Sequence, residues 1–410
     1  MGRMIQENLF EPLDPDWNIP TEYPDLTHYK QIAVDLETCD PHLTTLGPGW
    51  SRKDGFIVGI AVAAGDYQGY FPIRHQNGHN LDPKMTLKWL RKQMATPHID
   101  KIMHNATYDA GWLRAEGVEV QGRIIDTMVA APLVDENRFS FSLNNLGRDY
   151  LGERKDERLL RAAAREWGVD PKGEMWKLPP KYVGAYAEQD AVLTLKLYER
   201  LSIEIVKQDL THIFELETSL IPLMIDMREK GVRVDLDKTD LVRKDLRIKV
   251  REYKAEIKRK TGISIEPWAS ASVATVFDSL GLFYPKTEAG SPSFTKQYLN
   301  AHPNEVAQMI VKLREFDKAD STFIDSIMRH EHKGRIHTEF HQLRSDGGGT
   351  VTGRFSSSNP NLQQFPARDP EIKKAIRGLF LPEEGEKWGS FDYSSQEPRL
   401  LVHFASSIPE

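Results

Sequence analysis

Polar and apolar residues alternate in the manner of β-strands from Gln31 onward. Three short runs rich in strand-forming residues are separated by segments that contain Gly and Asp: QIAVDLE, FIVGIAVAAG and QGYFPI. This pattern predicts a meander of three strands. A helical pattern follows at 86–95, then a short strand at 101–105, and helices are predicted from about Thr107 and over about 181–201. Strands mixed with helices predict an α/β layer domain.

A second region begins near residue 210 and is mainly helical in pattern. Residues 213–231 carry apolar side chains at spacings of three and four, and the glycine that closes the run suits a helix stop. More helical pattern follows, and 334–343 has the pattern of a strand. The stretch 345–366 is rich in Gly, Ser and Pro, which is typical of a linker. Residues 388–407 predict a strand followed by a helix with an apolar face.

Composition and cysteine usage narrow the class of protein. The chain has 410 residues, of which 40% are apolar and 28% charged, and this length predicts two or three domains. No apolar run reaches the roughly 20 residues that span a bilayer. The first residues are acidic and rich in proline and lack the apolar core of a signal peptide. Cys39 is the single cysteine, which excludes an internal disulfide and a cysteine-based zinc site. We therefore expect a cytoplasmic protein that does not enter a membrane.

The net charge of −6 hides one strongly basic segment, LVRKDLRIKVREYKAEIKRK, at 241–260. A run of this kind is commonly the solvated face of a helix, and it can also be a stripe that faces nucleic-acid phosphates. Under the second interpretation the candidate phosphate contacts are Arg243, Lys244, Arg247, Lys249, Arg251 and Lys254, of which we single out Lys244, Arg247 and Arg251 for test. The charge pattern alone leaves both interpretations open.

Two carboxylates lie close together in the first strand pattern. Asp35 and Glu37 are two residues apart, so both side chains point to the same face of the strand. Like charges this close repel each other unless a cation lies between them. A pair of this spacing can equally lie on a solvated strand face, and only further carboxylates decide the matter.

Further polar groups come from two other elements. Asp109 follows Asn105 at a strand-to-helix junction, and Tyr186 and Asp190 lie four apart on one face of a predicted helix. Taken singly, Asp109 can be a helix cap, Tyr186 a core aromatic and Asp190 a surface residue. Their joint occurrence with the strand pair predicts one site with four carboxylates and a phenol.

The order D-x-E, N-x-x-x-D, Y-x-x-x-D resembles the proofreading 3′-5′ exonucleases whose site contains Asp, Glu, Asp, Asp and Tyr. The resemblance covers about 31–205 and implies an α/β ribonuclease H-like domain with a mixed sheet and helices. It implies that one divalent ion binds Asp35, Glu37 and Asp190.

By the same resemblance, a second divalent ion binds Asp35 and Asp109, Tyr186 orients the attacking water, and Asn105 supports the site. Phosphodiester cleavage needs an activated water and a stabilised leaving oxygen, which two metal ions about 4 Å apart can supply. Oxygen ligands alone suit Mg²⁺ or Mn²⁺ better than zinc. No core position departs from the pattern, so we expect an active exonuclease.

The segment TGRFSSSNPNLQQFP at 352–366 resembles the T-G-R-x-S-S-x-x-P-N-L-Q segment of family A DNA polymerases. This ordered match argues against a linker. In that family the arginine, asparagine and glutamine contact the primer-template from its minor groove, and these roles fall on Arg354, Asn361 and Gln363. Arg368 matches a basic position near the nascent base pair, and a surface salt bridge is the competing interpretation.

The last residues resemble the first palm motif of the same family. The resemblance implies that Asp392 binds both polymerase metal ions, that the Tyr393 carbonyl reaches one of them, and that Glu397 excludes a ribose 2′-hydroxyl. Gln396 and Pro398 replace the usual apolar neighbours of that glutamate. The fingers helix and the H-D-E turn of the family do not follow. We therefore expect an incomplete polymerase site that uses Mg²⁺ and dNTPs only with a second, C-terminal polymerase chain.

The combined patterns predict an exonuclease domain, then a mainly helical thumb and the first part of an α+β palm. The expected boundaries are a leader at 1–30, the exonuclease at 31–205, the palm root and thumb at 206–345, and the incomplete palm at 346–410. The histidines between 330 and 341 are candidates for a zinc site, but family A polymerases carry a similar sequence in the corresponding strand. We expect an open sheet edge near Asp392 and, as a result, poor solubility or self-association of the chain alone.

Three functions remain open at this point. The first is the N-terminal part of a replicative, phage-type DNA polymerase that binds primer-template and single-stranded DNA and proofreads in the host cytoplasm. The second is a stand-alone 3′-5′ exonuclease whose C-terminal half only holds DNA. The third is a non-catalytic DNA-binding subunit, against which the intact set of exonuclease carboxylates argues.

Overall fold

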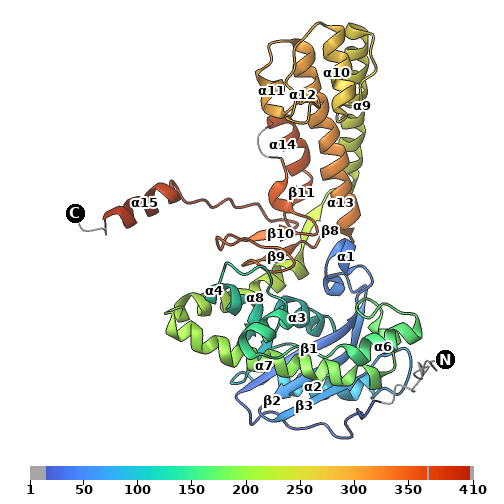
Figure 1. Ribbon diagram of the computed structural model, residues 1–410. Helices are drawn as coiled ribbons and strands as arrows, with labels where there is room; N and C mark the ends of the chain where they lie inside the picture. The colour runs from blue at the N-terminus through green and yellow to red at the C-terminus, as the bar shows by residue number, and fades with distance from the viewer. Residues whose placement is uncertain (1–14, 367–368, 407–410) are drawn as a thin grey trace, which may run out of the picture.

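The computed structural model describes residues 15–366 and 369–406. A lower α/β body carries a tall column of helices, and small sheets lie between the two (Figure 1). The last helix projects sideways from the rest of the chain (Figure 1). No helix within the described residues is long and apolar enough to cross a bilayer.

The lower body is built on one mixed sheet with the strand order β3-β2-β1-β4-β5. The predicted meander is confirmed, because β1, β2 and β3 are consecutive antiparallel neighbours. The parallel strands β4 and β5 extend the sheet beyond β1. The strands are β1 (Gln31–Cys39), β2 (Phe56–Ala64), β3 (Tyr67–Pro72), β4 (Asp100–Met103) and β5 (Ile124–Asp126).

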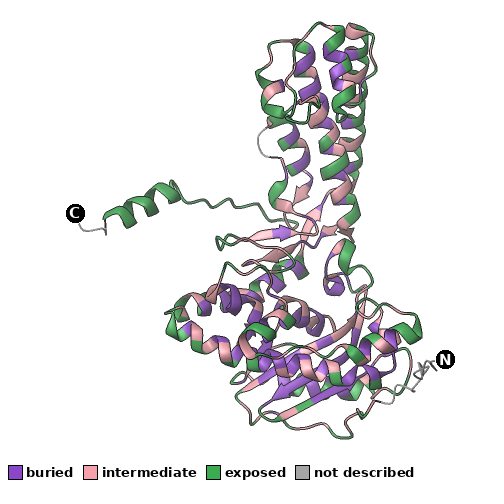
Figure 2. Ribbon diagram, in the orientation of Figure 1, coloured by how far each residue is buried: buried purple, intermediate pink, exposed green. Residues whose placement is uncertain are grey.

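Helices cover both faces of this sheet, and the buried residues form one core on each face (Figure 2). The long helix α7 packs across β1, β2 and β3 on one face. On the other face, α2 and α3 pack against the apolar side of β1. The helices of the body are α1 (Leu43–Leu46), α2 (Pro83–Met94), α3 (Ala106–Ala115), α4 (Thr127–Val134), α5 (Leu143–Leu146), α6 (Arg158–Trp167) and α7 (Gly184–Lys207).

The described part of the leader, 15–30, has no regular secondary structure, yet it packs on the body. Leu26 is 1% exposed, and Tyr23 stacks on Phe71. The Trp17 indole donates to Glu188 on α7 at 2.8 Å. These contacts make the segment part of the first domain's packing.

Helix α8 (Thr211–Lys230) lies against the body as well, because it contacts α3, α4 and β5. Its C-terminal glycine, Gly231, has a positive φ of 61°. A Cβ there would lie 2.8 Å from the His337 ring, so glycine is needed for both conformation and space. The predicted helix stop is therefore confirmed.

The column consists of helices whose buried residues form two further cores (Figure 1). The basic segment lies within α9 (Leu236–Thr261), whose side-chain cap is Asp235 accepting from Lys238 N. Helix α9 packs along α12 over much of its length. The remaining helices are α10 (Ser270–Ser279), α11 (Lys296–Ala301), α12 (Glu305–Lys318), α13 (Asp325–His330) and α14 (Pro370–Arg377).

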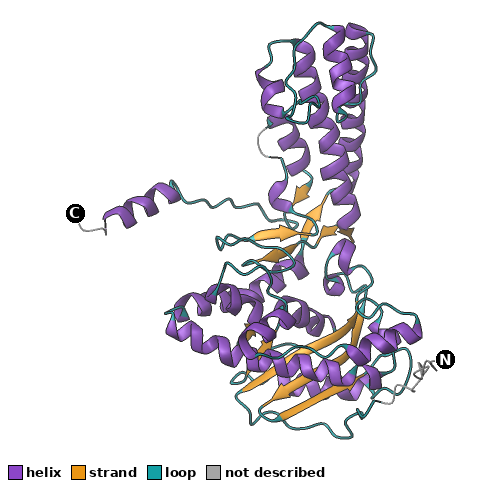
Figure 3. Cartoon of the chain, in the orientation of Figure 1, coloured by secondary structure: helices purple, strands orange, loops and turns teal. Residues whose placement is uncertain are grey.

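The strand predicted at 334–343 breaks into two strands that belong to different sheets (Figure 3). The first part, β8, joins the order β11-β6-β8-β7, and the second part, β9, pairs with β10. The break allows one segment to serve two sheets. The strands are β6 (Val232–Val234), β7 (Glu331–His332), β8 (Arg335–Ile336), β9 (Glu339–His341), β10 (Ser356–Ser358) and β11 (Phe380–Leu381).

The strand predicted before Asp392 is wrong. Residues 387–393 have no regular secondary structure and are exposed. A strand forms where a neighbour pairs with its backbone, and no described strand lies beside this segment. The helix that follows, α15 (Gln396–Ser406), is confirmed and has no buried residue.

Candidate active site

Three of the predicted metal ligands meet on the face of the sheet that α7 covers. Ile32, Val34 and Leu36 of β1 point into the core on the opposite face, so the alternating residues Asp35 and Glu37 face α7. Asp190 of α7 lies opposite them, and one ligand atom from each of the three side chains lies within 4.8 Å of the others. The predicted cluster is therefore formed by a strand and a helix that are distant in sequence.

Asp109 approaches the same strand from α3. Strand β1 pairs with β4 only as far as Ala33, so the later backbone on that edge lacks a strand partner. Asp109 Oδ1 accepts from Leu36 N at 3.2 Å, and the side chain is buried. This bond fixes Asp109 beside Asp35 and Glu37.

The junction before α3 depends on Asn105 and on a residue that the sequence analysis did not single out. Asn105 has a left-handed backbone with φ 72°, which asparagine tolerates better than most residues. Asp126 accepts from Asn105 N at 2.9 Å and from Ala106 N at 2.7 Å. Asn105 thus supports the site through its backbone, and Asp126 holds the turn.

Burial and mutual repulsion raise the pKa values of the clustered carboxyl groups. Burial, followed by the charge of Asp190, raises the pKa of Asp35 to about 7. Burial, followed by the charge of Asp35, places the pKa values of Glu37 and Asp109 well above their usual range. Burial also raises the pKa of Asp190, and Lys155 opposes that rise. A cluster of this kind favours a bound cation.

Lys155 is a member of the site that the sequence analysis missed. Its Nζ donates to Asp190 Oδ2 at 2.5 Å and to the Tyr186 hydroxyl at 3.3 Å. It also lies 5.1 Å from the centre of the Tyr186 ring. A single lysine in a loop has no periodic or spacing signal, so the sequence pattern could not have identified it.

The residues present fit divalent metal ions. The four carboxylates offer only oxygen atoms, which suits Mg²⁺ or Mn²⁺. Asp190 Oδ1 is buried and has no hydrogen-bond partner among the described residues, so it is available as a ligand while Oδ2 bonds Lys155. Tyr186 is half-buried one turn before Asp190, its hydroxyl accepts from Lys155, and burial raises the pKa of its phenol.

The predicted minor-groove residues lie far along the chain, around β10. Arg354 donates to Glu397 at 2.6 Å, which brings together two residues predicted to contact DNA and nucleotide. Asn361 Oδ1 accepts from Gln363 N at 3.0 Å, and Gln363 Nε2 donates to Phe355 O at 2.9 Å. These two bonds fix the shape of the loop.

The remaining predicted palm residues are not gathered into a second cluster. Asp392 is exposed, and Tyr393 is 80% exposed. The metal-type cluster found within the described residues consists of Asp35, Glu37 and Asp190. Arg368 lies outside the described residues.

The basic side chains of helix α9 fall into two groups, those in ion pairs and those exposed to solvent. Arg243, Arg247 and Lys249 form ion pairs with acidic residues of neighbouring elements. Lys244 and Arg251 are exposed and form no ion pair with another described residue. The phosphate-facing interpretation therefore stays a prediction, and Lys244 and Arg251 are the residues with side chains free of ion pairs in the described structure to which it would apply.

Sequence comparisons identify the family. A profile described as 3′-5′ exonuclease matches 24–205, and a profile described as DNA polymerase family A matches 237–408. The chain is 39% identical to a DNA-directed DNA polymerase of Pseudomonas phage M6 over 98% of its own length and 63% of that relative. The chain belongs to the family A DNA polymerases with a 3′-5′ exonuclease domain.

Other members of the family match over the same part. The DNA polymerase DpoZ of Acinetobacter phage SH-Ab 15497 is 30% identical over 94% of this chain and 63% of the relative. This family A chain therefore spans about 63% of the length of these two phage relatives. A solved structure, the POL domain of Pol1 from M. smegmatis in complex with DNA primer-template and dNTP, has a TM-score of 0.68 at 22% identity. It covers 88% of this chain and 56% of that chain, which supports the family A fold.

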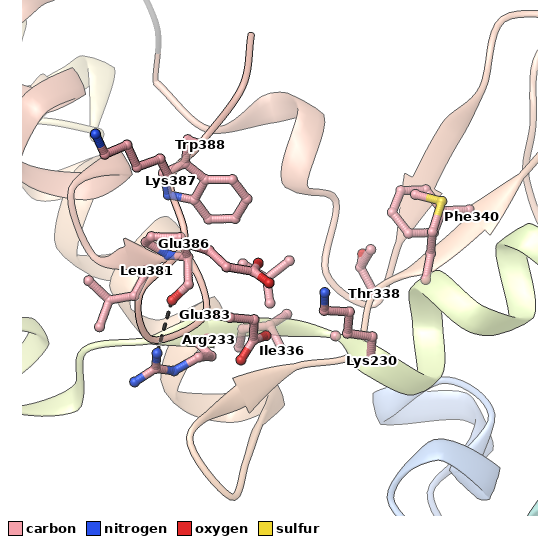
Figure 4. Close-up of a pocket in the computed structure, with 14 residues that line it drawn as sticks. Lys230, Arg233, Ile336, Thr338, Phe340, Leu381, Glu383, Glu386, Lys387 and Trp388 are labelled. Carbon is pink, nitrogen blue, oxygen red and sulfur yellow. Dashed lines mark hydrogen bonds between the residues drawn. The ribbon is translucent and has the colours of Figure 1, made fainter.

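A separate hollow of about 230 Å³ lies between the end of α8 and the segment after β11 (Figure 4). Lys230, Arg233 and Trp388 are among the residues that line it, and Arg233 donates to Pro382 O at 2.9 Å (Figure 4). None of the predicted site residues lines this hollow. The carboxylate cluster remains the candidate active site of this family A chain.

Proposed function

We propose that this chain is the proofreading part of a family A DNA polymerase and removes nucleotides from DNA 3′ ends in the presence of Mg²⁺ or Mn²⁺. The observation that carries the proposal is the convergence of Asp35, Glu37 and Asp190 within 4.8 Å. The bond between Asp109 and β1 adds the fourth carboxylate. Phage sources of two relatives favour the cytoplasm of an infected host as the place of action.

The proposed reaction is hydrolysis of the terminal phosphodiester. A water oxygen bonds to phosphorus, the bond from phosphorus to the 3′ oxygen breaks, and a nucleoside 5′-monophosphate and a new 3′-hydroxyl result. Bound divalent ions would activate the water and stabilise the leaving oxygen. Asp35, Glu37, Asp109 and Asp190 would hold these ions. Tyr186, beside Asp190, would orient the water through its hydroxyl.

The substrates proposed for the rest of the chain are primer-template DNA and dNTPs. The M. smegmatis structure contains both types of ligand. Here Arg354 and Gln363 are exposed, and Asn361 is half-buried between them. Asp392 and Tyr393 would serve nucleotide addition only together with a polypeptide that carries a second metal-binding aspartate. The exposure of Asp392, away from any described carboxylate cluster, supports this requirement.

The test is nucleotide release from a labelled single-stranded 3′ end and from a mismatched primer end. Asp35→Ala combined with Glu37→Ala should abolish release while the circular dichroism spectrum stays unchanged, because two ligands of the cluster are lost. The exposed pair Glu119→Ala and Glu166→Ala is the matched control and should cleave normally. Parental activity in the Asp35/Glu37 variant would show that the site is wrong.

A further inference from the structure

Lys155 lies in the candidate active site itself. Its side chain is 14% exposed, and that of its partner Asp190 is 5% exposed. The ammonium group bonds one oxygen of Asp190 and leaves the other, Oδ1, without a hydrogen-bond partner among the described residues. Lys155 therefore bonds one oxygen of Asp190 and leaves the other oxygen available to a metal ion.

The backbone around Lys155 is held in place on both sides. Gln189, which precedes Asp190 on α7, accepts from Asp156 N at 2.7 Å and donates to Arg154 O at 3.2 Å. Lys155 N donates to Asn144 Oδ1 at 3.1 Å. These bonds tie the loop to the helix that carries Asp190 and Tyr186, so the position of the lysine is built into the fold.

The balance of charges in the loaded site indicates which group Lys155 would pair with during the reaction. Four ionised carboxylates balance two divalent ions, and the scissile phosphodiester then adds one negative charge to a site that is largely removed from water. An unpaired charge in such a place is costly. Lys155 supplies the one positive charge that remains, and no second lysine or arginine is hydrogen-bonded to the three clustered carboxylates in the described structure.

We propose that Lys155 is a substrate-binding residue of the exonuclease site, which bonds Asp190 and Tyr186 before DNA arrives and pairs with the scissile phosphodiester when DNA and metal are bound. This proposal rests on the proposed exonuclease function. It gives Lys155 a role in binding the substrate and not in positioning the metal ligands.

The first test separates metal binding from cleavage. Lys155→Met removes a positive charge next to the metal position, so the affinity for Mn²⁺ in the absence of DNA should stay equal or rise. Calorimetry or electron paramagnetic resonance measures this affinity. Cleavage of a single-stranded 3′ end at saturating Mg²⁺ should fall about 100-fold, as on removal of one charge-stabilising group. Lys155→Arg should retain much of the rate. Lys196→Met, at an exposed lysine of α7 that pairs with Glu153, is the control for both measurements.

The second test measures the contact with the phosphate charge directly. A short oligothymidylate with a neutral methylphosphonate at its 3′-terminal linkage is compared with the ordinary oligonucleotide, with Ca²⁺ replacing Mg²⁺ so that binding is recorded. The wild-type chain should prefer the charged linkage, and Lys155→Met should lose about tenfold of that preference.

Three outcomes would overturn the assignment of Lys155. In the first, Lys155→Met keeps the wild-type preference for the charged linkage. In the second, Lys155→Met cleaves DNA at the wild-type rate. In the third, Lys155→Met loses affinity for Mn²⁺ together with its cleavage rate. A failure of the proposed exonuclease function looks different, because the wild-type chain itself would then neither bind Mn²⁺ at this cluster nor cleave DNA.

Discussion

Asp126 shows how one buried side chain can hold a functional junction. It is 5% exposed and accepts from the backbone N–H groups of Asn105, Ala106 and Met128. Two of these groups belong to the turn that leads into the helix of Asp109, and the third begins α4. The position of Asp109, a proposed metal ligand, therefore depends on a second carboxylate that holds the turn before its helix.

Replacing Asp126 by alanine should lower the free energy of unfolding by about 3 kcal/mol, because it leaves buried N–H groups without partners. The matched control is Asp82→Ala at the exposed start of α2, where one N–H is capped, and its cost should be about 1 kcal/mol. Urea unfolding measures both changes. Equal losses in the two variants would contradict the role assigned to Asp126.

His75 gives the first domain a dependence on pH. Its Nδ1 lies 2.7 Å from Leu178 O, so Nδ1 carries the proton, and Nε2 accepts from the buried Tyr70 hydroxyl at 2.7 Å. Burial lowers the pKa of His75 from 6.5 to about 4. In the unfolded chain the ring takes up a proton near pH 6.5, so its contribution to stability is present above that pH and is lost as the pH falls towards about 4.

We therefore expect His75→Gln to remove one component of acid destabilisation. A glutamine can donate to Leu178 O and accept from Tyr70, and it does not titrate. Between pH 7 and pH 4 the wild type should lose about 3 kcal/mol more than the variant. Urea unfolding at a series of pH values measures the difference. Parallel pH profiles would exclude His75 as the source.

At the scale of a single element, α9 combines ion pairs that hold it in the column with exposed basic side chains, for which we propose a role in DNA binding. Its paired residues bind the helix to the rest of the column, as in the ion pair of Arg247 with Asp320 at 2.7 Å. Lys244 and Arg251 remain exposed and form no ion pair within the described structure. Phosphate binding would use this second group, and its contribution would depend on salt.

Reversing both charges, Lys244→Glu with Arg251→Glu, should reduce the slope of log affinity against log salt by up to about 2 units for primer-template DNA. Fluorescence anisotropy over a salt series is the measurement. Lys84→Glu with Lys88→Glu, on the exposed face of α2, is the matched control and should leave the slope unchanged. An identical slope in the α9 variant would make the helix a solvated face only.

At the scale of the whole molecule, the polymerase part and the exonuclease part are joined by specific polar contacts. Asp346 accepts from Phe141 N at 2.6 Å and from Ser140 Oγ at 2.7 Å. Arg228 of α8 donates to Pro48 O at 2.8 Å. The segment that leads into the predicted DNA-binding loop thus touches the body that carries the carboxylates.

Asp346→Ala should loosen this connection without unfolding either part. The Phe141 amide should exchange with deuterium about five to ten times faster, since one hydrogen bond to a charged acceptor is lost. The Met128 amide, which bonds Asp126 inside the body, is the internal control. Hydrogen exchange read by mass spectrometry gives both rates, and an unaltered rate at Phe141 would show that the contact is not maintained in solution.

The sequence determined features that depend on neighbours along the chain. The strand meander, the helix that sets Tyr186 four residues before Asp190, and the stop at Gly231 follow from local periodicity and backbone preference. The two family motifs are also local. These signals were sufficient to predict a mixed sheet with helices in the exonuclease part. They also predicted four of the five residues that we propose for the carboxylate site and its lysine partner: Asp35, Glu37, Asp109 and Asp190.

The tertiary structure alone decided which distant groups meet. Lys155 reaches Asp190 because Gln189 of α7 is hydrogen-bonded to the loop on both sides of the lysine. Arg354 reaches Glu397, which lies 43 residues later in the chain. The segment at 334–343 divides between two sheets, and the segment before Asp392 forms no strand, because strands depend on partners supplied by other segments. Periodicity is a property of one element, whereas these contacts arise only when separate elements pack together.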